Sequence, residues 1–215
     1  FGRADDIKTP EGTLKNSQFT TSNFSARLGV KPFANHLLKV QYQRNYSYDV
    51  GIPGGSAFPG PATATYKNIG RTLLDASYEI SKLTKKFAAL KISYFHQYIV
   101  KDVEMRPNTV TNTTLANGNI QQTIPELVTP NAQHNINGAQ IQTNWIFSDN
   151  NSLIAGADIW GRRVTSDRTK YVTVNVINPD GKILKTNNIE RGETPIPTAS
   201  STSTGFYVND DLHLL

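Results

Sequence analysis

Apolar and polar residues alternate along seven stretches of the chain, which is the pattern of β-strands with one dry face and one wet face. In the first stretch, for example, Phe24 and Leu28 lie on one face while Ser25 and Arg27 lie on the other. The stretches cover residues 18–30, 36–48, 70–80, 87–101, 135–147, 152–164 and 205–213. The pattern predicts an all-β protein.

The connections between these stretches alternate in length. Short ones cover 31–35, 81–86 and 148–151, and long ones cover 49–69, 102–134 and 165–204. Outer-membrane β-barrels have short turns at one end and long loops at the other. We therefore predict an antiparallel up-and-down meander that forms part of a transmembrane β-barrel. A soluble β-sandwich explains the alternation but not the connection lengths, and it stays open as an alternative.

The faces can be assigned from the alternation, because side chains of a strand point to opposite sides in turn. The apolar residues predicted to face lipid include Leu28, Val40, Leu74, Leu90, Ile141 and Ala155. Those predicted to face the lumen include Gln43, Asp75, Ser93, Gln142 and Asp158. Aromatic residues gather near the short turns (Tyr78, Trp145 and Phe147) and near the long connections (Tyr46, Tyr48 and Tyr98). Two such belts are typical of membrane barrels.

Composition narrows the function classes. The chain has no cysteine, which excludes disulfides and thiolate sites, and its four histidines are scattered, so we expect no metal site and no cofactor. The net charge is +5, but the 22 Lys and Arg are dispersed, so we expect no nucleic-acid partner. No GxSxG motif marks a nucleophile. We expect no catalytic residues and no enzyme activity, with an outer-membrane hydrolase kept as an alternative.

Turn chemistry stands out in the third long connection. The sequence Asn178-Pro179-Asp180-Gly181 lies between two β-patterned stretches, 172–177 and 182–186. Such residues favour a tight turn. We predict a two-stranded ribbon that projects from the barrel at this point.

Two motifs carry a resemblance to a known family. The first runs from Tyr42 to Gly55 as YQRNYSYDVGIPGG, with Phe58-Pro59 and Arg71 beyond it. The second is GETPIP at 192–197, followed by GFYVNDD at 205–211. They resemble strand and loop motifs in the barrel of TonB-dependent outer-membrane receptors. The motifs cover about 45 residues; neither is catalytic.

The resemblance implies a receptor in the outer membrane of a Gram-negative bacterium that captures a scarce nutrient chelate for TonB-energised import. The chelate would be a ferric siderophore, haem or a cobalamin-like ligand, and a passive porin-like channel is the alternative. Residues 1–215 would form a partial barrel domain of about seven or eight strands. No plug domain is visible in it, so the plug and the TonB system would be partners through other parts of the receptor, with outer-membrane lipid around the barrel.

In this family the ligand is held by the plug and the extracellular loops, so the resemblance places ligand contacts in the long connections. Donors and cations there could bind an anionic chelate, and aromatic rings offer flat apolar surface. Arg106 and His134 are the leading candidates because they flank the same connection. The predicted ligand-binding residues are Arg106, His134, Asn108, Tyr171, Arg191, Phe58 and Tyr66, with Tyr48 as a further aromatic candidate.

Overall fold

The computed structural model describes residues 1–53 and 62–212, and this part of the chain contains twelve β-strands and no helix. None of its segments is a helix long and apolar enough to cross a membrane. The strands are β1 (Gly2–Ala4), β2 (Ile7–Thr9), β3 (Gly12–Leu14), β4 (Phe19–Val30), β5 (His36–Ile52), β6 (Thr63–Ser81), β7 (Phe87–Arg106), β8 (Thr111–Thr114), β9 (Ile120–Ser148), β10 (Asn151–Ile177), β11 (Ile183–Glu193) and β12 (Ala199–Leu212).

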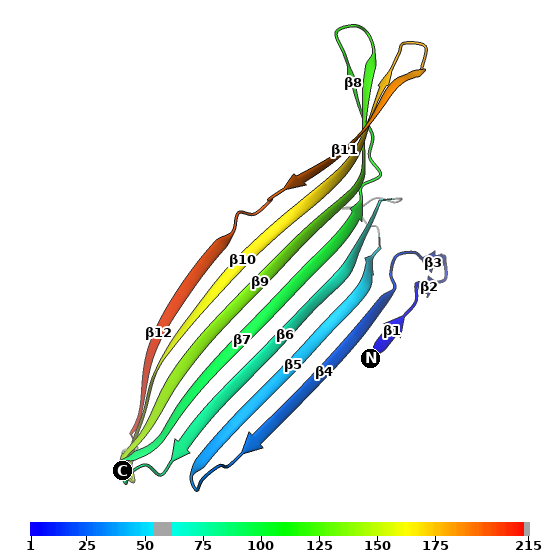
Figure 1. The fold of residues 1–215 in the computed structure, drawn as a ribbon. Helices are drawn as coiled ribbons and strands as arrows, with labels where there is room; N and C mark the ends of the chain where they lie inside the picture. The colour runs from blue at the N-terminus through cyan, green and yellow to red at the C-terminus, as the bar shows by residue number, and fades with distance from the viewer. Residues whose placement is uncertain (54–61, 213–215) are drawn as a thin grey trace.

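Ten of these strands form one antiparallel sheet, and β2 and β3 form a separate hairpin. The order across the sheet is β1-β4-β5-β6-β7-β9-β10-β11, with β12 also paired to β10 and β8 also paired to β9. Figure 1 shows the long strands running side by side, with the β8–β9 and β10–β11 hairpins projecting beyond the rest. Neighbours in sequence are neighbours in space, which confirms the predicted meander. A sandwich would instead divide these strands between two stacked sheets.

Each of the seven predicted stretches coincides with a strand, apart from Gln18 before β4 and His213, which lies outside the described residues, but the long connections differ from the prediction. We expected loops at 49–69, 102–134 and 165–204, whereas β5, β6, β7, β9 and β10 continue far into them. Strands β9 and β10 have 29 and 27 residues. In the parts of β9 and β10 that extend into the long connections, Thr, Asn and Gln alternate with Val and Ile. These parts therefore pair as strands without a strongly apolar face. Apart from the stretches 172–177 and 182–186, which were predicted as a ribbon, these strand extensions were expected to be loop.

The ribbon predicted around Asn178 is confirmed. Val176 pairs with Lys185 and Ile177 with Ile183 across the β10–β11 hairpin. The Asn178 side chain accepts a hydrogen bond from the Lys182 amide at 2.7 Å, and Gly181 has φ of +83°. A positive φ at the last turn position is what glycine tolerates best.

Strands β11 and β12 share one edge of β10. Strand β11 pairs with Arg168–Ile177 and β12 with Asn151–Val164. In the gap between them, Ser166 Oγ donates to the Ile196 carbonyl and accepts from the Ile196 amide, both at 3.1 Å. The GETPIP motif therefore marks the break between two strands, because its two prolines cannot donate to the ladder.

The register places the six residues predicted to face lipid on one side of the sheet and the five predicted to face the lumen on the other. Leu28 lies opposite Val40, Val40 opposite Ala76, and Ile141 opposite Ile92. By alternation, all six predicted lipid-side residues share this side of the sheet, which we call the apolar face. The five predicted lumen-side residues share the other side, the polar face.

The sheet has almost no core of its own. Its buried hydrophobic residues, among those described, are Ala62, Ala64, Val100 and Val128. Large side chains on the apolar face stay uncovered, with Leu28 63% and Phe206 82% exposed. A soluble monomer rarely leaves so extended an apolar surface bare. This face needs a partner that the described chain does not supply.

Three glycines sit directly opposite aromatic rings on neighbouring strands. A Cβ on Gly138 would lie 2.3 Å from Phe95, one on Gly156 2.3 Å from Tyr207, and one on Gly70 2.4 Å from Tyr46. The rings lie over the glycines and pack where a side chain would otherwise stand. The contact with Gly138 gives Phe95, one of the large apolar side chains on the polar face, a place to pack.

Candidate functional site

The upper polar face, towards the long connections, is strongly basic. On β7, β9, β10 and β11, the polar-face positions from the Gln97 row to the Lys170 row carry five cations and one carboxylate. We call these residues the cationic strip: Lys101, Arg162, Arg168, Lys170, Arg191 and Glu193. Residues 162, 168 and 170 of β10 share one side because even numbers separate them. Glu193 and Arg191 lie opposite two of them, and Lys101 is connected to the same side of β10 through Ala132 and Ser166.

Glu193 holds the upper end of the cationic strip together. Arg168 Nε donates to its carboxylate at 3.0 Å, its Nη2 makes a second short contact, and Lys170 Nζ donates at 3.0 Å. Arg191 Nε lies 3.6 Å away. The side chain of Glu193 is only 19% exposed, whereas that of Arg191 is 74% exposed. One carboxylate thus gathers three cations and leaves an excess of positive charge.

The hydrogen bonds from Arg168 and Lys170 hold the pKa of the Glu193 carboxyl below its ordinary value. Hydrogen bonds to the charged form of an acid favour that form. Glu193 is therefore a carboxylate at neutral pH, and it orders the cations around it.

His134, a predicted ligand residue, belongs to the lower part of this surface. It lies opposite Ile99 and Val164 on the polar face. Arg162 donates to its Nδ1 from Nε at 3.1 Å and from Nη2 at 2.5 Å. Because Nδ1 accepts these bonds, the ring is neutral with its proton on Nε2, which is left as a donor.

The structure separates Arg106 from His134, which corrects the expectation that they flank one loop. Ile99 pairs with His134, and Arg106 lies seven residues further along β7. At about 3.3 Å per residue, that is about 23 Å of strand. Arg106 instead forms an ion pair with Glu104 at 3.1 Å.

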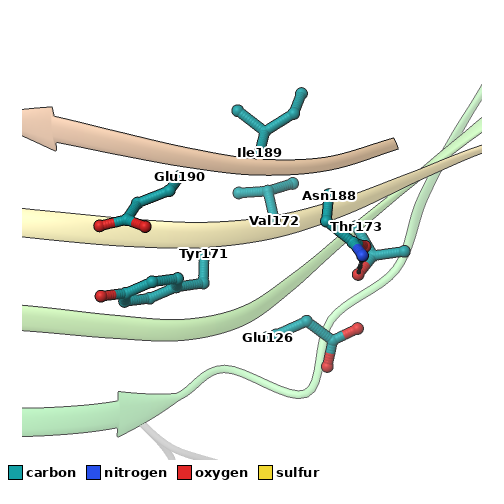
Figure 2. A pocket seen from close by; sticks show the side chains of 7 residues that line it. All are labelled: Glu126, Tyr171, Val172, Thr173, Asn188, Ile189 and Glu190. Carbon is teal, nitrogen blue, oxygen red and sulfur yellow. Dashed lines mark hydrogen bonds between the residues drawn. The ribbon is translucent and has the colours of Figure 1, made fainter. Parts of the chain in front are cut away.

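Arg106 and Asn108 line a hollow of about 370 Å³ near the start of β8. Glu126 lines both this hollow and a second one of about 440 Å³ that contains Tyr171 and Glu190. In Figure 2 the ring of Tyr171 and the carboxylate of Glu190 extend in the same direction, with Glu126 below them on a different strand. Arg106, Asn108 and Tyr171 are therefore grouped around Glu126, apart from the cationic strip.

The other predicted residues are distributed as follows. Arg191 belongs to the cationic strip, and Tyr66 lies in β6 opposite Val50 and Val103. Tyr48 stacks on Tyr46 with ring centroids 6.1 Å apart. Phe58 lies outside the described residues. Five predicted residues were expected in loops but lie in strands, because the strands extend beyond their apolar stretches: Tyr66, Arg106, His134, Tyr171 and Arg191.

Sequence reasoning missed five members of the cationic strip: Lys101, Arg162, Arg168, Lys170 and Glu193. The signal lay in the even spacing of residues 162, 168 and 170, which becomes visible only once β10 is known to continue to Ile177. Among the described residues, no group of three or more His, Asp or Glu side chains is placed to hold a metal ion.

No protein-family model matches the sequence, and no curated protein matches it. Three chains of solved structures match. One of them, described as "Copper transporter OprC", has a TM-score of 0.54 and 12% sequence identity, and the match covers 99% of this chain and 38% of that chain. At such identity the likeness concerns the fold alone. The chain therefore has the fold of a segment of that transporter and spans 38% of its length.

Proposed function

We propose that this chain forms part of the barrel wall of an outer-membrane receptor that captures an anionic metal chelate for TonB-energised import. The chelate class would include ferric siderophores, haem and cobalamin-like ligands. The proposal extends the resemblance of the motifs at Tyr42–Gly55 and 192–197 to the whole chain. A plug domain and the TonB system would be contributed by other parts of the receptor and the cell.

The cationic strip is the observation that carries the proposal. Five cations and one carboxylate lie on the upper polar face, so this surface attracts anions. Arg168, Lys170 and Arg191 could bind carboxylate or phenolate oxygens of a chelate in charge-assisted hydrogen bonds. Binding and release change no covalent bond, so the proposed function requires no acid–base pair.

The apolar face supports the membrane location. From Leu153 to Arg163, β10 spans ten residue steps, or about 33 Å along the strand. At the tilt of about 35–45° that barrel strands adopt, this corresponds to a height close to the roughly 25 Å apolar band of an outer-membrane barrel. Trp145 and Phe147 lie at its lower end, and Tyr98 pairs with Asn135 near the upper end.

The test is uptake by cells that express the full-length protein with Lys170→Gln and Arg191→Gln. Labelled ferric citrate serves as the anionic chelate, and cupric ion serves as a second cargo because the structural neighbour is described as a copper transporter. We expect the double variant to lose most ferric citrate uptake, and an uncoupler of the proton gradient to abolish uptake by the unchanged protein.

The matched control is Lys39→Gln, an exposed cation on the polar face near the short turns. It should leave uptake unchanged. Uptake that survives the uncoupler would identify a passive channel instead. Uptake of cupric ion but not of the chelate would overturn the anionic cargo, and protein that stays soluble without detergent would overturn the membrane assignment.

A further inference from the structure

Two arginines mark the upper limit of the uncharged part of the apolar face. Arg44 and Arg163 belong to one row of directly paired residues, which runs Phe24, Arg44, Thr72, Tyr98, Asn135, Arg163 and Ser200. On the strands β4 to β10 and β12, the apolar face carries no charged side chain between this row and the short turns except histidines and Asp210 at the lower end.

Both arginines are available to a ligand. Both residues are exposed, and neither forms an ion pair with a carboxylate in the described part of the chain. Arg44 lies over the ring of Tyr46, 4.6 Å from its centroid, and touches Tyr48 Oη at 3.4 Å. These contacts orient its guanidinium and leave other N–H donors free. The nearest acids on this face, Asp102 and Asp167, come two rows further up.

Neutral donors and acceptors surround Arg163. A hollow of about 370 Å³ has among its lining residues Asn135, Asn137, Gly161, Arg163, Ser200 and Thr202, which share the apolar face. Asn137 is fixed by Tyr94 Oη at 2.9 Å and His96 Nδ1 at 2.8 Å, and its own amide donates to Asn135 Oδ1 at 3.3 Å. Amides and hydroxyls beside an arginine suit a sugar that carries a phosphate.

We propose that the row of Arg44 and Arg163, with the amides of Asn135 and Asn137, binds the phosphorylated sugar headgroup of a glycolipid in the outer leaflet. The inference rests on the proposed membrane location. The row lies about 25 Å above the aromatic residues near the short turns, which is the height of the apolar band of a barrel. It is therefore at the level of the lipid phosphates. The two arginines are four strand spacings apart, or about 19 Å, so they would hold separate phosphates or neighbouring lipids.

The test uses full-length protein in a neutral detergent, titrated with a phosphorylated outer-leaflet glycolipid and with the same lipid after dephosphorylation. Bound lipid is counted by native mass spectrometry. We expect the phosphorylated lipid to bind more tightly. Arg44→Gln and Arg163→Gln should each weaken it about fivefold, and the double variant roughly 25-fold, as expected for about 1 kcal/mol per arginine at a membrane surface.

Arg27→Gln is the matched control, because Arg27 is an exposed arginine on the polar face of the same sheet, held by Gln41. It should bind the lipid like the unchanged protein. Equal binding of both lipids, or equal loss in Arg27→Gln, would overturn the proposal. Displacement of the lipid by millimolar inorganic phosphate alone would show that the site takes free phosphate rather than a headgroup. Protein that needs no detergent would instead contradict the proposed function.

Discussion

At the scale of single residues, Glu193 is the negative centre of a positive surface. Its lowered pKa arises first from the hydrogen bond of Arg168 and then from that of Lys170. An acid whose pKa falls on folding stabilises the fold above its ordinary pKa and loses that contribution as the pH falls through its lowered folded value. The β10–β11 pairing at this point should therefore weaken in acid.

Replacing the carboxylate makes this pH dependence measurable. Glu193→Gln should lower the melting temperature of the full-length protein at neutral pH, and the difference from the unchanged protein should vanish as the pH drops through the lowered pKa of Glu193. Glu190→Gln, three residues away with no ion pair among the described residues, is the control and should show little change. A deficit of Glu193→Gln that persists unchanged in strong acid would contradict the assignment.

Arg106 and His134 offer a second residue-level prediction. Because about 23 Å of strand separates them, their contributions to ligand binding should be independent. The loss of binding free energy in the double alanine variant should equal the sum of the single losses within about 0.5 kcal/mol. Titration of the four proteins with ferric citrate gives these numbers. A coupling above about 1 kcal/mol would place the two residues in one site.

At the scale of elements, the aromatic rings that lie over glycines fix strand positions. Gly138→Ala would place a methyl group 2.3 Å from Phe95, and Trp160 lies on its other side with its Cβ at 2.9 Å. We expect a loss of about 1–3 kcal/mol from overpacking. Unfolding of the refolded protein in urea measures it.

Gly29→Ala is the control for this substitution. Gly29 is also on the polar face, and an added Cβ there meets nothing within 4 Å. It should change stability by less than about 0.5 kcal/mol. If both variants lose the same stability, the loss comes from replacing a glycine within a strand and not from the contact with the Phe95 ring.

The apolar parts of the strands were predictable because membrane-like alternation has a strict period of two. Leu28, Val40 and Ile141 were placed on one face from the sequence alone, and the register agrees. The strand extensions were not predictable in this way. Thr173 and Asn188, for example, lie opposite each other and share a side-chain hydrogen bond, and such a pairing of residues distant in sequence depends on the register.

The cationic strip shows the same limit at the candidate site. His134 and Arg191 could be chosen from the sequence because they are cations or donors near predicted loops. Glu193 was not chosen, because nothing local to it indicates that Arg168 lies directly opposite. Cross-strand partners 25 residues apart become visible only when the register is known.

At the scale of the whole molecule, the two faces should meet different solvents. Spin labels at Leu28, Leu90 and Ile141 should be accessible to a lipid-soluble relaxing agent, and labels at Gln43 and Ser93 to a water-soluble one. The measurement uses full-length protein in lipid vesicles. Labels of both classes at positions predicted to share one face of a strand would contradict the register.

The tip of the β10–β11 hairpin offers a practical consequence. The turn from Asn178 to Gly181 closes a ribbon that is paired on both strands and stands at the far end from the short turns. Foreign sequence is best tolerated at such exposed tips. A short epitope inserted between Pro179 and Asp180 would lie at the tip of the hairpin, beyond the rest of the sheet. In the proposed outer-membrane receptor, intact cells would present it to antibodies without a change to the sheet below.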